Sequence, residues 1–263
     1  MTTQPFNTDP MSNADLQDAG NQQLHKPSAF KAVLWLVLIA IIFYSAAILP
    51  IVGYSGYLAA TQPELLQDQE LLESLVLDMA MTPVFNAWVM VLQFALLVPL
   101  VLLIANFAQQ SWRQTLAFRS ISLKVLGLGL AVYAVYFAVQ SGINHIWPMD
   151  LGLLEGFANS QHLGLLLAMV FLAPVTEELI FRGYLFKAWR HTWLGAHGTI
   201  LLTSVLFTLV HASQYPLLTL AILFTFSLIL GYAREKTGSI WLPIILHMLN
   251  NLIGGLALLY FFS

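Results

Sequence analysis

The chain has 263 residues, of which 59% are hydrophobic and only 9% are charged. Soluble globular domains are ~45–50% apolar and ~25% charged, so this composition excludes a disordered chain and disfavours a soluble enzyme. A net charge of −3, from 10 Lys and Arg against 13 Asp and Glu, offers no basic patch for nucleic acid. Because there is no cysteine, disulfides and thiolate chemistry are excluded. A mean hydropathy of +0.77 predicts a multi-pass membrane protein in contact with the lipid bilayer.

Residues 1–28 are polar and lack the charged-then-apolar order of a signal peptide, which predicts a disordered cytoplasmic tail. Seven apolar segments follow, each close to the ~20 residues that cross ~30 Å of hydrocarbon. Backbone groups in lipid must be satisfied within their own segment, so we expect helices. The predicted fold is an all-α polytopic bundle of about seven transmembrane helices with an intramembrane polar site. The segments are 32–53, 84–108, 125–147, 163–180, 198–215, 217–233 and 240–262.

The basic residues predict the orientation of these spans. With seven spans and a cytoplasmic N-terminus, all 10 Lys and Arg fall at cytoplasmic ends or in cytoplasmic loops. Loops 61–82 and 148–162, on the other side, carry acids but no Lys or Arg. Cytoplasmic loops of membrane proteins are enriched in Lys and Arg. We therefore expect the bacterial cell membrane, with the N-terminus cytoplasmic and the C-terminus outside.

Polar residues interrupt three of the apolar segments. The fourth holds Glu177 and Glu178, the fifth His211, and the seventh His247 and Asn251. A charged residue at mid-bilayer costs at least ~2.5–3.5 kcal/mol, so such residues usually face the bundle interior and mark function. Glu177 and His211 lie equally far from the tip of the hairpin that joins their helices, which predicts a similar depth. His247 and Asn251 are four residues apart and therefore share one helix face.

These residues form three motifs in order: Glu177-Glu178-Leu-Ile-Phe-Arg182, Phe207-Thr-Leu-Val-His211 and His247-Met-Leu-Asn-Asn251. They resemble the family of CAAX prenyl protease type II and bacteriocin-processing enzymes, the CPBP or Abi family. Its pattern is Glu-Glu-x-x-x-Arg, then Phe-x-x-x-His, then His-x-x-x-Asn. The resemblance covers roughly residues 163–255 and implies a catalytic helical core at 163–263. Residues 29–162 would then add three N-terminal transmembrane helices and their loops.

The resemblance implies an intramembrane endopeptidase of the glutamate type. Glu177 would act as general base on a water, aided by His211, and His247 and Asn251 would stabilise the oxyanion. A carboxylate in an apolar pocket suits this role, since burial brings its basicity towards that of a base working near neutral pH. The substrate would be a membrane-associated or lipidated peptide or protein, and no cofactor is expected.

Three further residues support the site in this interpretation. Glu178 and Arg182 would hold the first motif in place, together with Phe207 from the second motif. By spacing alone, Glu178 and Arg182 stand four residues apart and predict an ordinary ion pair on one helix.

Other functions stay open at this stage. Glu177, His211 and His247 would also suit a catalytic zinc, with two His and one carboxylate leaving a position for water. Outside enzymes, the chain would be a non-catalytic membrane scaffold or a bacteriocin-immunity protein.

Overall fold

The computed structural model describes residues 29–106 and 111–261, and within them every regular element is a helix. The predicted tail at 1–28 lies outside the described residues. Within the described residues, six helices are long and apolar enough to span a membrane, which makes the chain a multi-pass integral membrane protein. These spans are α2 (Ala29–Thr61), α4 (Pro83–Asn106), α6 (Leu123–Ile146), the Leu163–Trp189 helix, α11 (Leu217–Thr237) and Trp241–Phe261. Short elements join them: η1 (Pro63–Gln67), α3 (Gln69–Ala80), α5 (Trp112–Thr115) and η2 (Gly152–Phe157).

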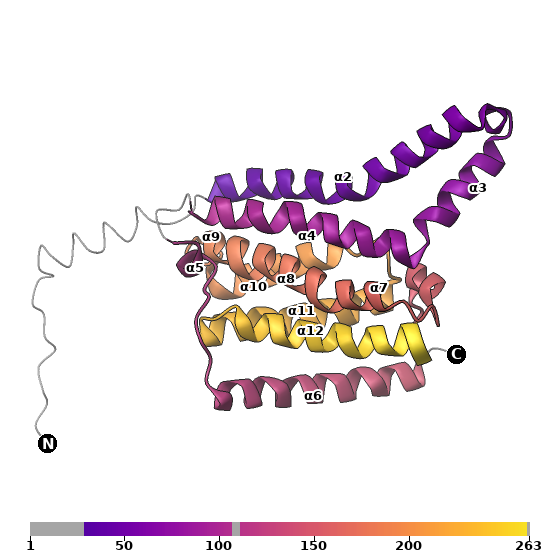
Figure 1. Ribbon diagram of the computed structural model, residues 1–263. Coiled ribbons are helices and arrows are strands. Elements are labelled where there is room, and N and C mark those ends of the chain that lie inside the picture. The colour runs from indigo at the N-terminus through magenta and orange to yellow at the C-terminus, as the bar shows by residue number, and fades with distance from the viewer. Residues whose placement is uncertain (1–28, 107–110, 262–263) are drawn as a thin grey trace, which may run out of the picture.

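The fifth predicted segment differs from the other six. Its helix, α10 (Gly195–Leu209), has 15 residues, about 22 Å at 1.5 Å per residue, which is less than the ~30 Å of hydrocarbon. Residues 210–215 form turns before α11 begins. α10 still packs tightly along α11, since a Cβ built on Gly231 would lie 2.8 Å from the Ile200 side chain. Figure 1 shows α10 running beside α11 within the bundle.

The fourth span is one continuous helical stretch of 27 residues rather than the 18 predicted. It comprises α7 (Leu163–Leu167), η3 (Ala168–Leu172), α8 (Ala173–Glu178), η4 (Leu179–Leu185) and α9 (Phe186–Trp189). η3 and η4 are π-helical and flank α8 on both sides. Pro174 has no N–H to offer the carbonyl of Val170, which favours a wider turn at this point. α4, α10, α11 and α12 (Trp241–Leu256, continued by η5, Ala257–Phe261) all contact this span, so it lies at the centre of the bundle.

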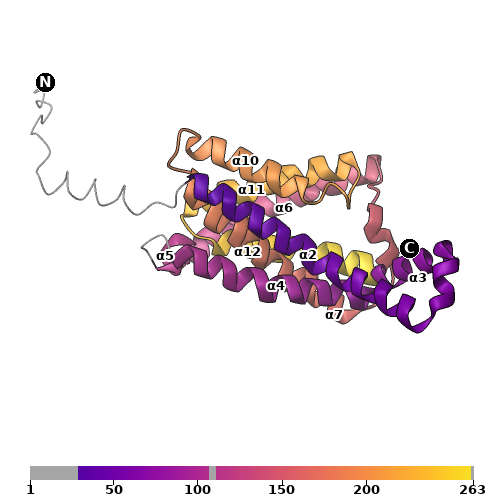
Figure 2. The same ribbon diagram turned by 90° about the horizontal axis from the view of Figure 1, so that it is seen from above.

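α2 is longer than a membrane span. Its 33 residues extend about 50 Å, and Pro50 lies inside the helix. The first part of α2 packs against α4, whereas the last part leaves the bundle and pairs with α3. Figures 1 and 2 show this hairpin projecting past the ends of the other helices.

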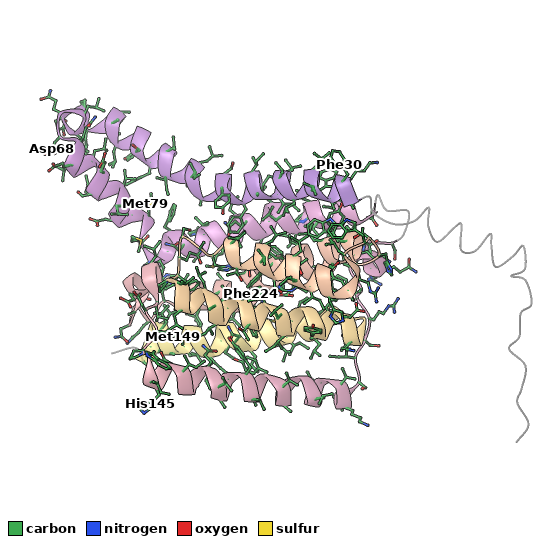
Figure 3. The ribbon with its side chains drawn as sticks, turned by 180° about the vertical axis from the view of Figure 1, so that it is seen from behind. Phe30, Asp68, Met79, His145, Met149 and Phe224 are labelled. Carbon is green, nitrogen blue, oxygen red and sulfur yellow. The ribbon has the colours of Figure 1, made fainter. Side chains whose placement is uncertain are left out.

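The two ends of the bundle differ in charge. The start of α2, the α5 region, α9 and the end of α11 lie at one end (Figure 1), and in or next to these segments are Lys31, Arg113, Arg119, Lys187, Arg190, Arg234 and Lys236. The acidic α3 and η2 regions lie at the other end, where Figure 3 labels Asp68, Met79, His145 and Met149 opposite Phe30. Among the basic residues that the structure describes, Arg182 lies fully buried in the fourth span, and Arg234 in α11 is also buried. This burial requires partners inside the bundle.

Candidate functional site

Glu178 and Arg182 form a fully buried ion pair, with Arg182 Nη1 donating to Glu178 Oε1 at 2.9 Å. The pair reaches beyond its own helix, because Arg182 Nη2 donates to the Ser227 carbonyl at 2.9 Å and to its hydroxyl at 2.6 Å. The guanidinium also lies 4.8 Å from the centroid of the Phe207 ring. The ion pair predicted from spacing is therefore also a tie between the fourth span, α10 and α11.

His247 bridges the two adjacent glutamates. Its Nδ1 lies 2.9 Å from Glu178 Oε1, and its Nε2 lies 3.7 Å from Glu177 Oε2. A carboxylate only accepts hydrogen bonds, so while Glu178 is ionised Nδ1 must be the donor. Nε2 then carries a proton only when the ring is an imidazolium, which is the form that can donate to an oxyanion. The buried ion pair thus orients His247 towards Glu177.

Glu177 lies at the boundary between the buried cluster and open space. Its side chain retains 16% exposure, whereas Glu178 beside it retains none. A cavity of about 20 Å³ lies against Glu177, lined also by Phe43, Met90, Gln93, Ala173 and Thr176. A space of this size accommodates one water molecule. Glu177 therefore has an imidazole on one side and room for a water on another.

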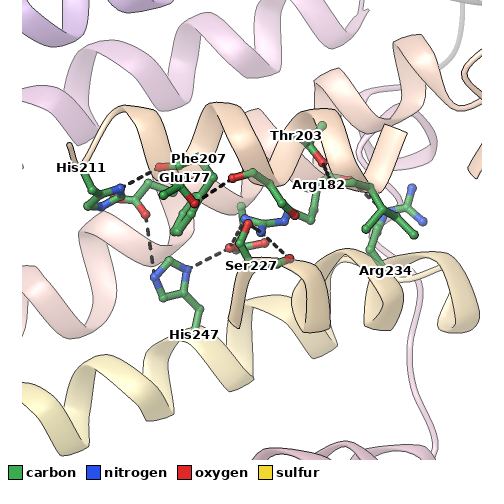
Figure 4. Close-up of polar contacts among 12 residues, drawn as sticks. Glu177, Arg182, Thr203, Phe207, His211, Ser227, Arg234 and His247 are labelled. Atoms are coloured by element: carbon green, nitrogen blue, oxygen red, sulfur yellow. Dashed lines mark hydrogen bonds and ion pairs between the residues drawn. The ribbon is translucent and has the colours of Figure 1, made fainter. Parts of the chain in front are cut away.

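His211 lies just beyond the end of α10. Its Nδ1 is 2.8 Å from the Phe207 carbonyl, so Nδ1 donates and Nε2 is the acceptor of the neutral ring. The Phe207 ring lies 4.9 Å from the His211 ring and 5.7 Å from the His247 ring, between centroids. Figure 4 shows His211, Glu177, Phe207 and His247 gathered in one region of the bundle. The similar depth predicted for Glu177 and His211 is consistent with this arrangement.

Asn251 lies one helical turn beyond His247 on α12. Its side-chain amide donates to the Met169 carbonyl at 2.9 Å, in the π-helical segment η3. The hydrogen bond is to the backbone of the fourth span rather than to another predicted site residue. Since the amide carries two hydrogens, Met169 uses one and orients the other.

Two polar residues at the site were not predicted from the sequence. Ser227 lies in the apolar helix α11 and accepts from Arg182, and Tyr215 stacks on His211 with ring centroids 6.2 Å apart. Tyr215 follows His211 by four residues, and this spacing is the one signal that could have found it. Nothing in the sequence around Ser227 marks it.

The residues proposed for zinc do not converge as a metal site. No group of three His, Cys, Asp or Glu with metal-binding geometry occurs in residues 29–106 and 111–261. Nδ1 of His211 and Nδ1 of His247 are engaged with a carbonyl and a carboxylate respectively, which leaves Nε2 of each ring as its available nitrogen. Because the three predicted ligands do not form a group with metal-binding geometry, the proposed mechanism uses no metal.

Comparison with known proteins adds family information for part of the chain. Residues 159–253 match the family described as type II CAAX prenyl endopeptidase, Rce1-like. An Escherichia coli protein described as an uncharacterized 24.3 kDa protein is 42% identical over 94 residues, which are 34% of this chain and 42% of that protein. The chain thus aligns with less than half the length of this relative. No solved structure matches.

Proposed function

Because residues 159–253 form a domain of the Rce1-like type II CAAX prenyl endopeptidase family, we propose that this chain is an intramembrane endopeptidase. The observation that carries this proposal is the position of Glu177, between a cavity for one water and the Nε2 of His247. Such an arrangement suits general-base activation of water, with a donor close to the charge that develops.

The proposed reaction is hydrolysis of one peptide bond. Glu177 takes a proton from the water as the water oxygen attacks the carbonyl carbon, and the carbonyl π electrons move to oxygen. His247 as imidazolium and the second N–H of Asn251 donate to this oxyanion. When the oxyanion collapses, the C–N bond breaks and the proton held by Glu177 passes to the leaving amine. His211, with a free Nε2, assists by accepting that proton in transit.

The buried ion pair supports this chemistry indirectly. Glu178 and Arg182 fix the ring orientation of His247, and Phe207 packs against both histidines and the guanidinium. These contacts hold the reacting groups in place before substrate binds, which is how polar sites in a low-dielectric interior lower barriers.

The proposed substrate is a peptide or protein at the membrane, with a lipidated C-terminus as the class suggested by the family description. The proposed topology keeps the N-terminus in the cytoplasm, with α10 and residues 210–215 completing a seventh crossing and the C-terminus outside. Support comes from the basic residues gathered at one end of the bundle. We propose the bacterial cell membrane as location and 163–263 as the catalytic core.

The test uses the full chain in lipid nanodiscs with a farnesylated peptide ending in a CaaX sequence. Glu177→Gln preserves shape but removes the base, so cleavage should fall by ~10²–10⁴-fold. The matched control is Glu73→Gln, at an exposed glutamate of α3. Full cleavage by Glu177→Gln would refute the glutamate mechanism, whereas no cleavage by the wild-type chain would favour a scaffold or immunity function. Loss of cleavage on chelation, with rescue by zinc, would favour a metalloprotease instead.

A further inference from the structure

One polar side chain outside the matched domain reaches the cavity at Glu177. Gln93 lies in α4, where it is the single polar residue between Asn86 and Asn106. It stands ten residues into the helix, about 15 Å from its start and therefore near the middle of a ~30 Å bilayer. An amide at this depth is costly unless its polar atoms have partners.

The Gln93 amide is held in one orientation. Its Nε2 donates to the Phe43 carbonyl of α2 at 3.1 Å. A carbonyl oxygen can only accept, so the amide nitrogen must face Phe43 and the amide oxygen must point elsewhere. Gln93 and Glu177 both line the same cavity. The acceptor that Gln93 can offer to this cavity is therefore Oε1, whereas the Thr176 hydroxyl in the same wall donates to the Leu172 carbonyl.

Two acceptors around a space for one water have a chemical consequence. A water donates at most two hydrogen bonds, and here Glu177 and Gln93 Oε1 would take one each. Its oxygen lone pairs are then directed away from both groups, ready to attack a carbonyl. We propose that Gln93 is a positioning residue that orients the attacking water against Glu177. This inference rests on the proposed function, and it assigns α2 and α4 a part in forming the site.

Kinetics of Gln93→Leu test the proposal with the farnesylated CaaX peptide. Loss of the acceptor should lower kcat by ~10–100-fold and leave KM within about twofold, because the side chain contacts the water and not the peptide. The matched control is Gln140→Leu, the same change at a glutamine of another span, α6, which should keep wild-type kcat. A Gln93→Leu enzyme with wild-type kcat, or with only KM raised, would overturn the proposal.

The Gln93→Glu variant distinguishes a role of Gln93 in orienting the water from a role in joining α4 to α2. A second carboxylate beside Glu177 disfavours ionisation of Glu177, so the acid limb of the kcat–pH profile should move to higher pH by about one unit. The other charged or titratable groups near Glu177 are unchanged in this variant, and they are Glu178, Arg182, His211, Tyr215 and His247. An acid limb at its wild-type position would contradict the proposal.

A cryo-EM map of the wild-type chain in nanodiscs provides a readout without substrate. We expect an ordered water within ~3.2 Å of both Gln93 Oε1 and a Glu177 oxygen, and its loss in Gln93→Leu. A water bound to Glu177 without contact to Gln93 would overturn the inference. The two proposals fail separately: full cleavage by Glu177→Gln rejects the proposed function, whereas an inactive Glu177→Gln with a fully active Gln93→Leu rejects the role of Gln93 alone.

Discussion

The buried ion pair should control the stability of the whole bundle. Arg182→Met removes the guanidinium and leaves Glu178 ionised in a fully buried site, with His247 as its remaining partner. Removing one member of a buried pair costs about 3–5 kcal/mol, because the other charge stays uncompensated. The same variant also breaks the tie to Ser227 on α11. We therefore expect Tm to fall by about 6–20 °C, at about 2–4 °C per kcal/mol.

The partner variants should be milder. Glu178→Gln keeps an oxygen that can accept hydrogen bonds from both Arg182 and His247. The free energy of unfolding should therefore fall by only about 1–3 kcal/mol, because these hydrogen bonds lose the contribution of the carboxylate charge. Ser227→Ala leaves the Ser227 carbonyl as acceptor for Arg182 and should cost about 1 kcal/mol. In the double variant Arg182→Met with Glu178→Gln, neither ionised group remains buried alone. The double variant should therefore lose less free energy of unfolding than the sum of the losses in the two single variants, by about 1–3 kcal/mol.

Thermal unfolding in one detergent, followed by tryptophan fluorescence at a single scan rate, measures these differences. A constant scan rate matters because unfolding of a membrane protein can be irreversible, which makes Tm rate-dependent. The reasoning would be refuted by an Arg182→Met protein within 2 °C of wild type. Strict additivity of the double variant would likewise show that the two charges do not depend on each other.

Two further outcomes follow from the structure. Asn251→Ala should lower kcat by ~10²–10³-fold if its second N–H donates to the oxyanion, and unchanged cleavage would exclude that role. Reporter fusions after Asp78 and after Lys236 should report opposite compartments, and the same compartment for both would reject the topology.

The residues of the candidate site stand out in the sequence because ionisable groups are conspicuous in lipid-spanning segments. Glu177, Glu178 and His247 interrupt apolar segments where ionisable groups are costly, and their spacing matches a family pattern. The contacts that these residues make with one another were less predictable. The pairing of Glu178 with Arg182 followed from helical spacing, but the bond from Glu178 to His247 spans 69 residues and depends on how α12 packs.

The sequence alone determined the class of protein and the approximate positions of the spans, because a bilayer demands long apolar helices and tolerates few charges. It overestimated the fifth span, because residues 210–215, which include His211, Ser213 and Gln214, form turns and the helix ends at Leu209. Only the tertiary structure decided which faces meet. Helices as uniformly apolar as α2 and α4 carry no polar stripe that identifies their packed side, so the approach of Gln93 to Glu177 depends on helix rotation and packing.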